Sequence, residues 1–206
     1  MATLEAASGP QTRLRMSAAE YLRRERDPAR STEPKSEFLY GEVTEMPGAS
    51  RVHDRIVKNV LRVLLDQVDG RTGEVGTSDL KVGFADDGYQ YPDASVAGLE
   101  VETLDSHLDV VTNPVVLFEV LSPSTEAADR GKKFRFYRTI PSLRVYVLIA
   151  QDDIRVERSR RDDDEWPMRE IAGEDAVLEI AEIGLALPLS EIYRGVSFVE
   201  SEPNGI

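Results

Sequence analysis

Two carboxylates and a lysine are the residues of this chain whose types and spacing could do chemistry: Asp93, Glu119 and Lys133. Glu119 lies inside the apolar run from Val115 to Leu121, whose short length and flanking prolines predict a buried strand. An ionised carboxylate in such surroundings is very costly unless it is paired, hydrogen-bonded or bound to a metal ion. The sequence therefore indicates either a buried ion pair or a metal site.

The composition limits which metal ions and partners fit. Two histidines and no cysteine among 206 residues exclude thiolate catalysis, disulfides and Cys-based metal sites, which leaves mainly oxygen ligands for hard cations such as Mg²⁺. The 25 basic and 38 acidic residues give a net charge of −13, which argues against broad electrostatic attraction to nucleic acid. A nucleic acid partner must therefore meet a local basic patch.

No apolar stretch approaches the roughly 18 residues of a membrane span, and the N-terminus lacks the basic-then-apolar order of a signal peptide. We therefore expect a cytoplasmic protein with no membrane partner. The length suits one domain. We expect that domain at residues 16–196, between a disordered N-terminal tail (1–15) and a C-terminal tail (197–206).

Three helices are predicted around the candidate residues. Ser17 and Glu20 form a capping-box pattern, Ser50 precedes a long apolar stripe at helical spacing, and a third helix follows a Ser/Thr-rich start. The predicted ranges are 18–27, 50–69 and 125–140. In the third helix Lys133 shares a side with the residue four positions later, whereas Lys132 is rotated by about 100°. We therefore predict that Lys133, and not Lys132, reaches the carboxylates.

Strands are predicted between and after these helices. Two short strands surround Gly41, and Asp87-Gly88 marks a hairpin whose second arm runs from Tyr89 to Val96. Later strands are expected at 115–121, 145–149, 154–158, 176–180 and 184–187, before a short helix near residue 192. We expect the strands of Asp93 and Glu119 to be neighbours in a sheet that the second and third helices flank.

This order of elements resembles the PD-(D/E)xK nuclease superfamily, and within it the Uma2 family of restriction-endonuclease-like proteins. The residues that carry the resemblance are Tyr40-Gly41-Glu42-Val43 with Met46, Ser50 with His53, Ser78-Asp79, Tyr91-Pro92-Asp93, Glu119 to Ser124, and Lys133 with Tyr137. The resemblance covers the chain from about Ser17 to Ile192. It implies an α/β fold of a single domain, with a restriction-endonuclease-like mixed β-sheet flanked by helices.

The resemblance also implies an activity, which is Mg²⁺- or Mn²⁺-dependent hydrolysis of phosphodiester bonds in DNA by an endonuclease. Asp93 and Glu119 would be the metal ligands, because two clustered carboxylates repel each other unless a divalent cation lies between them. Lys133 would be the catalytic lysine. The auxiliary residues would be Glu42, His53, Asp79 and Tyr137.

One position departs from the superfamily pattern. The lysine expected two residues after the glutamate is Leu121 here. In Uma2-like sequences this role is assigned to a lysine or glutamine on the next helix, four residues before a tyrosine, which Lys133 and Tyr137 match. The predicted phosphate-contacting surface is basic and comprises Arg135, Arg138 and Arg144.

Simpler interpretations stay open at each of these residues. Pro-Asp is common in turns, His53 fits a packing or capping role, and Glu119 with Lys133 fits a structural salt bridge. Two other functions stay open: a binding or interaction module that kept the fold without the chemistry, and a hydrolase of another phosphate ester. The sequence does not choose between DNA and RNA or between a monomer and a homodimer.

Overall fold

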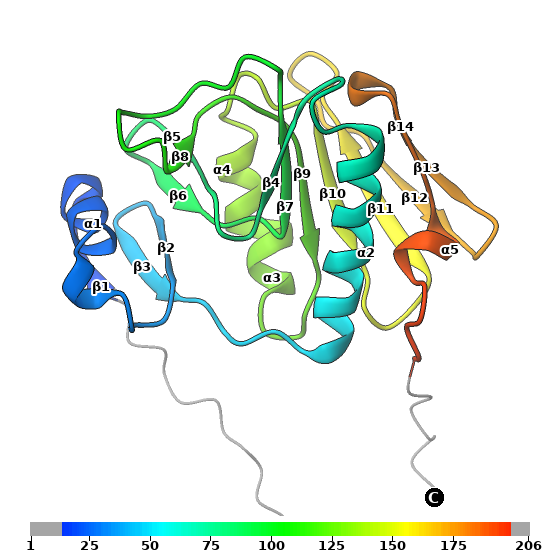
Figure 1. Ribbon diagram of the computed structural model, residues 1–206, viewed down its shortest axis with the longest axis horizontal. Helices are drawn as coiled ribbons and strands as arrows, with labels where there is room; N and C mark the ends of the chain where they lie inside the picture. Colours follow the sequence, from blue (N-terminus) through cyan, green and yellow to red (C-terminus); the bar gives the residue numbers. More distant parts are fainter. Residues whose placement is uncertain (1–13, 199–206) are drawn as a thin grey trace, which may run out of the picture.

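The computed structural model describes residues 14–198, which form two six-stranded sheets, one hairpin and several helices (Figure 1). The first sheet has the order β1-β3-β2-β6-β5-β8, with β1 at Leu14–Arg15, β2 at Ser36–Leu39, β3 at Glu42–Glu45, β5 at Lys81–Phe84, β6 at Gly88–Gln90 and β8 at Val110–Val111. The second sheet has the order β12-β11-β10-β9-β7-β4, with β4 at Glu74–Thr77, β7 at Ala94–Ala97, β9 at Pro114–Val120, β10 at Val145–Ile149, β11 at Arg155–Arg160 and β12 at Met168–Ala172. The hairpin pairs β13 (Val177–Ile180) with β14 (Leu185–Pro188).

The helices connect and cover these sheets. The α-helices are α1 at Ala18–Glu25, α2 at Arg51–Gln67, α3 at Glu126–Ala128, α4 at Phe134–Tyr137 and α5 at Leu189–Ile192. A π-helical segment, Asp129–Lys133, joins α3 to α4, and 3-10 turns occupy Pro28–Arg30 and Ala181–Ile183. None of the helices in residues 14–198 has the length and apolar character that crossing a bilayer requires.

The second sheet is mixed and has β9 at its centre. β10 runs parallel to β9, with Leu148 opposite Glu119, whereas β7 runs antiparallel to β9, with Ala94 opposite Phe118. Asp93 directly precedes β7. The prediction that the Asp93 and Glu119 segments are neighbours is therefore confirmed.

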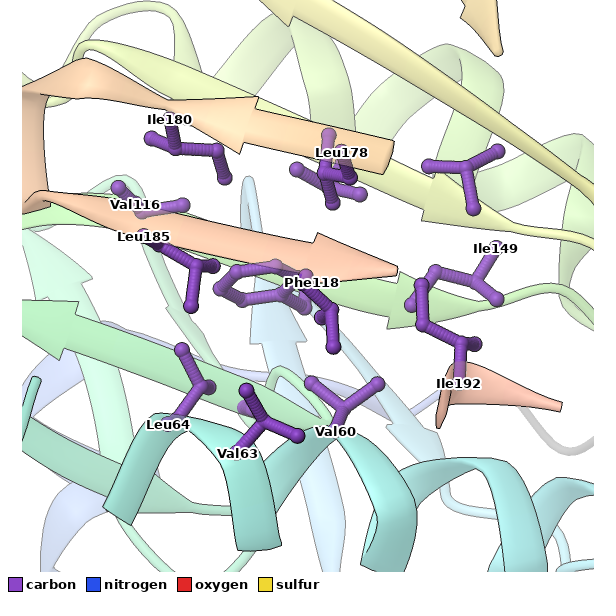
Figure 2. Close-up of a cluster of buried hydrophobic side chains, with 14 of the residues drawn as sticks. Val60, Val63, Leu64, Val116, Phe118, Ile149, Leu178, Ile180, Leu185 and Ile192 are labelled. Carbon is purple, nitrogen blue, oxygen red and sulfur yellow. The ribbon is translucent and has the colours of Figure 1, made fainter. Parts of the chain in front are cut away.

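One face of the second sheet packs against α2 and the β13–β14 hairpin (Figure 2). The side chain of Ser50 accepts the N–H of His53 at 3.0 Å and caps α2, as the sequence predicts. Val60 and Leu64 of α2 then pack in one cluster with Phe118 of β9, whose alternate side chains face this side.

The opposite face of the second sheet packs against the segment from α3 to α4. Phe136 and Tyr137 of α4 lie in one cluster with Leu117 of β9 and with Leu39 and Val82 of the first sheet. This segment therefore lies between the two sheets. Since side chains alternate along a strand, Glu119 shares the face of Leu117 and points at this segment.

Two predicted elements are broken in the structure. The arm predicted as one strand from Tyr89 to Val96 divides at Pro92, so that β6 belongs to the first sheet and β7 to the second. The φ angle of proline is fixed, and proline has no backbone N–H to donate to a neighbouring strand. The strand pairing therefore ends there. The helix predicted at 125–140 is interrupted by the π-helical turn around Gly131, a residue with low helix propensity.

Four strands were not predicted, namely β1, β4, β8 and β12. Leu14 and Arg15, which the sequence assigned to the N-terminal tail, pair with β3 as β1. β12 is an edge strand whose residues are mostly exposed, so it lacks the apolar alternation that predicts strands. The remaining predicted tail residues, 1–13 and 199–206, lie outside the described part of the chain.

Candidate active site

Glu119 is the charged residue of β9, and it is 4% exposed. Its Oε1 accepts hydrogen bonds from Lys133 Nζ at 3.1 Å and from Tyr137 OH at 2.9 Å. Both donors lie on the side of the helical segment that the sequence predicts to face the carboxylates. Lys132, by contrast, makes no ion pair or hydrogen bond among the described residues and is half-buried at a neighbouring cavity.

The side chain of Asp93 is hydrogen-bonded to the backbone of the same strand, β9. Its Oδ2 accepts the N–H of Val120, the residue after Glu119, at 2.7 Å. Asp93 lies between β6 and β7, outside both strands. Its carboxylate can therefore reach across to β9. Asp93 and Glu119 are therefore held side by side on neighbouring segments.

Lys133 contacts three carboxylates. Its Nζ lies 3.0 Å from Glu37 Oε1, 3.1 Å from Glu119 Oε1 and 3.3 Å from Asp129 Oδ1, and its side chain is 8% exposed. The contact with Glu119 is a hydrogen bond, whereas those with Glu37 and Asp129 are ion pairs. The lysine is thus both buried and paired, as a buried charge must be.

The electrostatics of this cluster follow from burial and crowding. Burial raises the pKa of Glu119 well above its usual range, against the opposing effect of Lys133, and the nearby negative charge of Asp129 raises it further. Burial alone would lower the pKa of Lys133, but the charges of Glu119 and Glu37 outweigh it and raise this pKa well above the ordinary value. Lys133 therefore carries its positive charge at neutral pH. Burial raises the pKa of Asp129 as well, although Lys133 opposes the shift.

His53 lies against Asp93 from the first turn of α2. Its Nε2 is 3.2 Å from Asp93 Oδ2. Burial would lower the pKa of His53, but the hydrogen bond to Asp93 and the charge of that carboxylate raise it above the usual value. The histidine thus serves as a partner of Asp93 in addition to its backbone role at the helix cap.

These side chains line one cavity of about 360 Å³. Its charged lining residues are Glu37, His53, Asp54, Asp93, Glu119, Asp129 and Lys133. Five carboxylates thus face one ammonium group and one imidazole. The surplus of negative charge makes the cavity attractive to cations.

The donor set of the cavity suits a hard divalent cation. Asp93 uses Oδ2 and Glu119 uses Oε1 for the contacts above, so the other oxygen of each carboxylate has no hydrogen-bond partner among the described residues. Within residues 14–198, no group of three His, Asp or Glu side chains is arranged to hold a metal ion. Mg²⁺ is commonly held by one or two carboxylates, with waters and substrate phosphates in the remaining positions. Asp93 and Glu119 supply that number of carboxylates.

Two residues predicted as auxiliaries lie outside this cavity. Asp79 is exposed and forms an ion pair with Lys35. Glu42 lies 3.4 Å from Arg15 and lines an adjoining cavity of about 460 Å³, which Lys133 also borders.

The three arginines predicted at the rim of the site do not line the cavity. Arg135 and Arg138 are exposed, and the guanidinium of Arg138 lies over the ring of Phe134. Arg144 donates its backbone N–H to the carbonyl of Val115, which is four strand residues, or about 13 Å, from Glu119. Arg135 and Arg138, at α4, and Arg144, directly before β10, therefore lie away from the carboxylates.

Sequence reasoning missed two residues of the cluster, Glu37 and Asp129. Glu37 lies in a hairpin whose acidic residues look solvated in the sequence, and only the packing of the first sheet brings it to Lys133. Asp129 had a usable signal, because it stands four residues before Lys133 and residues at that spacing share a helix side.

Comparisons with known proteins place this chain among uncharacterised relatives. Two proteins of Synechocystis sp. (strain ATCC 27184 / PCC 6803 / Kazusa), both named as uncharacterized, are 40% identical over 168 residues and 34% identical over 166 residues. These alignments cover 81% and 80% of this chain, and 93% and 86% of the relatives.

A solved structure has the same fold. It is the crystal structure of a protein from Anabaena variabilis ATCC 29413, described as a putative nuclease belonging to DUF820, with a TM-score of 0.71 and 20% identity. The match covers 86% of this chain and 97% of that chain, which confirms the predicted class of mixed sheets flanked by helices. The family model that matches residues 18–190 is Uma2, described as "Putative restriction endonuclease". The chain therefore belongs to the Uma2 family.

Proposed function

We propose that this protein is an endonuclease that hydrolyses phosphodiester bonds of DNA with Mg²⁺, or Mn²⁺, as its cofactor. The observation that carries the proposal is the convergence of Asp93, Glu119 and Lys133 on one cavity, with Lys133 Nζ 3.1 Å from Glu119 Oε1. The family description and the named activity of the similar solved structure support the same class of reaction.

Each residue has a role that follows from its surroundings. Asp93 and Glu119 would hold the cation, which when bound lowers the pKa of a water molecule and stabilises charge on the scissile phosphate. Lys133 would orient the attacking water or neutralise charge on the phosphate. Because its pKa is raised, Lys133 acts as a charged hydrogen-bond donor and not as a general base.

Tyr137 and His53 would position the two carboxylates. Tyr137 donates its hydroxyl to Glu119 Oε1 at 2.9 Å, and His53 contacts Asp93 Oδ2 at 3.2 Å. In each case the contact leaves the second carboxylate oxygen for the cation. Glu42, which lines the adjoining cavity together with Lys133, would contact substrate there.

A second candidate function is favoured by one observation. Lys133 forms ion pairs with three carboxylates, which is the arrangement of a structural ion-pair cluster. A protein in which this cluster only stabilises the fold would be a binding or interaction module without catalysis. The two candidates differ in what a cation and a substitution of Lys133 do.

A cleavage assay separates them. Supercoiled, linear and single-stranded DNA and an RNA of the same sequence are incubated with Mg²⁺, Mn²⁺ or EDTA. We expect cleavage of DNA with either cation, none with EDTA, and none for Asp93→Asn or Lys133→Ala under conditions in which both variants are folded. Lys132→Ala is the matched control and should cut like the parent. If neither cation supports cleavage of any substrate, or if Lys133→Ala and Asp93→Asn cut as fast as the parent, the nuclease proposal is wrong.

A further inference from the structure

Two carboxylates of the cavity, the half-buried Glu37 and the buried Asp129, have no part in the reaction proposed above. Glu37 and Asp129 each contact Lys133, at 3.0 and 3.3 Å. The side chain of Glu37 is 15% exposed and that of Asp129 is 2% exposed. Carboxylates with so little contact with water need a compensating positive charge. The ammonium of Lys133 is the cation that both of them contact.

The two carboxylates reach Lys133 from different parts of the fold. Glu37 stands on β2 of the first sheet, and its Oε1 also accepts the backbone N–H of Tyr91 at 3.2 Å. Asp129 stands at the start of the π-helical segment, four residues before Lys133, where its backbone carbonyl accepts the hydroxyl of Tyr146 at 3.1 Å. The two carboxylates that contact the ammonium therefore come from separate elements, each of which has a further hydrogen bond at that residue.

The three contacts of Lys133 differ in kind. Lys133 donates a hydrogen bond to Glu119 Oε1, and it forms ion pairs with Glu37 and Asp129. If Lys133 acts on the substrate, one N–H must turn toward the cavity, and Glu119 is the partner that the cation would also engage. Glu37 and Asp129 are then the two ion-pair partners that keep the ammonium in place during the reaction.

We propose that Glu37 and Asp129 are positioning residues, which hold the charged side chain of Lys133 at the inner wall of the cavity so that one N–H can serve the substrate. The proposal rests on the nuclease function proposed above. Neither residue is a ligand of the cation in this scheme. Glu37→Gln and Asp129→Asn test it, because both substitutions keep the side-chain shape and remove the charge.

The first measurement observes Lys133 directly and needs no substrate. The chain has five lysines, of which Lys81 and Lys133 are buried, so ¹H–¹⁵N spectra of the lysine ammonium groups are simple to assign. The Lys133 signal should be visible in the parent, since buried and hydrogen-bonded ammonium protons exchange slowly. Either substitution should shift or broaden this signal. The Lys81 signal, from an ammonium 3.3 Å from Asp109, should stay in place as an internal reference.

Glu157→Gln is the matched control. Glu157 is also a buried carboxylate, and it pairs with Arg130 at 2.5 Å and with Arg155 at 2.7 Å, away from the cavity. This variant should lose stability as the other two do, yet leave the Lys133 signal unchanged. A loss of stability alone therefore does not reproduce the expected result.

The second measurement is the steady-state cleavage of DNA. A misplaced catalytic group can cost up to about 100-fold in rate, so kcat should fall by about 10- to 100-fold in Glu37→Gln and Asp129→Asn. KM should change by less than about twofold, because neither residue binds DNA in this scheme. An unchanged Lys133 signal in both variants overturns the proposal, as does a parental kcat. If the parent cuts no nucleic acid with any cation, the nuclease function fails, and the spectra alone decide whether the two carboxylates position Lys133.

Discussion

Replacing Lys133 by methionine should destabilise the folded protein strongly at neutral pH. The substitution keeps an unbranched side chain one atom shorter but leaves Glu37, Glu119 and Asp129, which lie 3.0, 3.1 and 3.3 Å from Nζ, without their shared cation. Removing one partner of a buried ion pair costs about 3–5 kcal/mol. For a chain of this size each kcal/mol lowers Tm by about 2–4 °C, so the expected fall is about 6–20 °C.

The loss should depend on pH in a defined direction. The pKa of Glu119 is raised in the folded protein by burial, even with Lys133 present, and removing the lysine raises it further. A carboxyl group whose pKa is raised in the folded state contributes stability at pH values below its pKa in the unfolded state. This contribution is lost as the pH rises through the pKa of the folded state. The destabilisation of Lys133→Met should therefore be largest at pH 7–8 and shrink as the pH falls toward about 4.5.

Urea denaturation from pH 4.5 to 8, in buffer containing EDTA, measures this effect. Lys132→Met is the control, since its side chain is half-buried without an ion pair among the described residues, and it should change the free energy of unfolding by less than about 0.5 kcal/mol. A loss in Lys133→Met no greater than in Lys132→Met would refute the reasoning. A loss of the same size at every pH would show that the buried carboxylates are not its cause.

Three further predictions concern the cation, a second ion pair and the arginines. Saturating Mg²⁺ should raise the Tm of the parent, because a ligand at 100 times its Kd stabilises by about 2.7 kcal/mol; Asp93→Asn should lose this rise, and calorimetric scans with Mg²⁺ and EDTA check it. The hydrogen bond from Arg130 lowers the pKa of Glu157, so the ionised carboxylate stabilises the fold above about pH 4.5, and this contribution is lost as the pH falls through the pKa of the folded state. In acid titrations, the difference in stability between the parent and Glu157→Gln should therefore shrink below that pH, and a constant difference would contradict this prediction. Replacing Arg135, Arg138 and Arg144 together with alanine should weaken DNA binding alike on unrelated sequences and reduce the slope of log Kobs against log[salt] by up to about 2.7; an unchanged slope would remove these arginines from the interface.

Local patterns in the sequence predicted the parts of the site that lie within one element. The cap at Ser50, the inward face of Glu119 and the shared side of Lys133 and Tyr137 all follow from spacing along a strand or a helix. Each depends only on residues a few positions apart. For that reason the sequence could also place Lys133, and not Lys132, at the carboxylates.

Tertiary structure decided the rest, because it depends on elements that are remote in the chain. The break at Pro92 sends one predicted strand into two sheets, and the packing of those sheets around the α3–α4 segment brings Glu37 to Lys133. The direction of β10 carries Arg144 away from the cavity. The sequence alone therefore determined which residues point inward from each element, whereas only the packing of the sheets decided which inward-pointing charges meet.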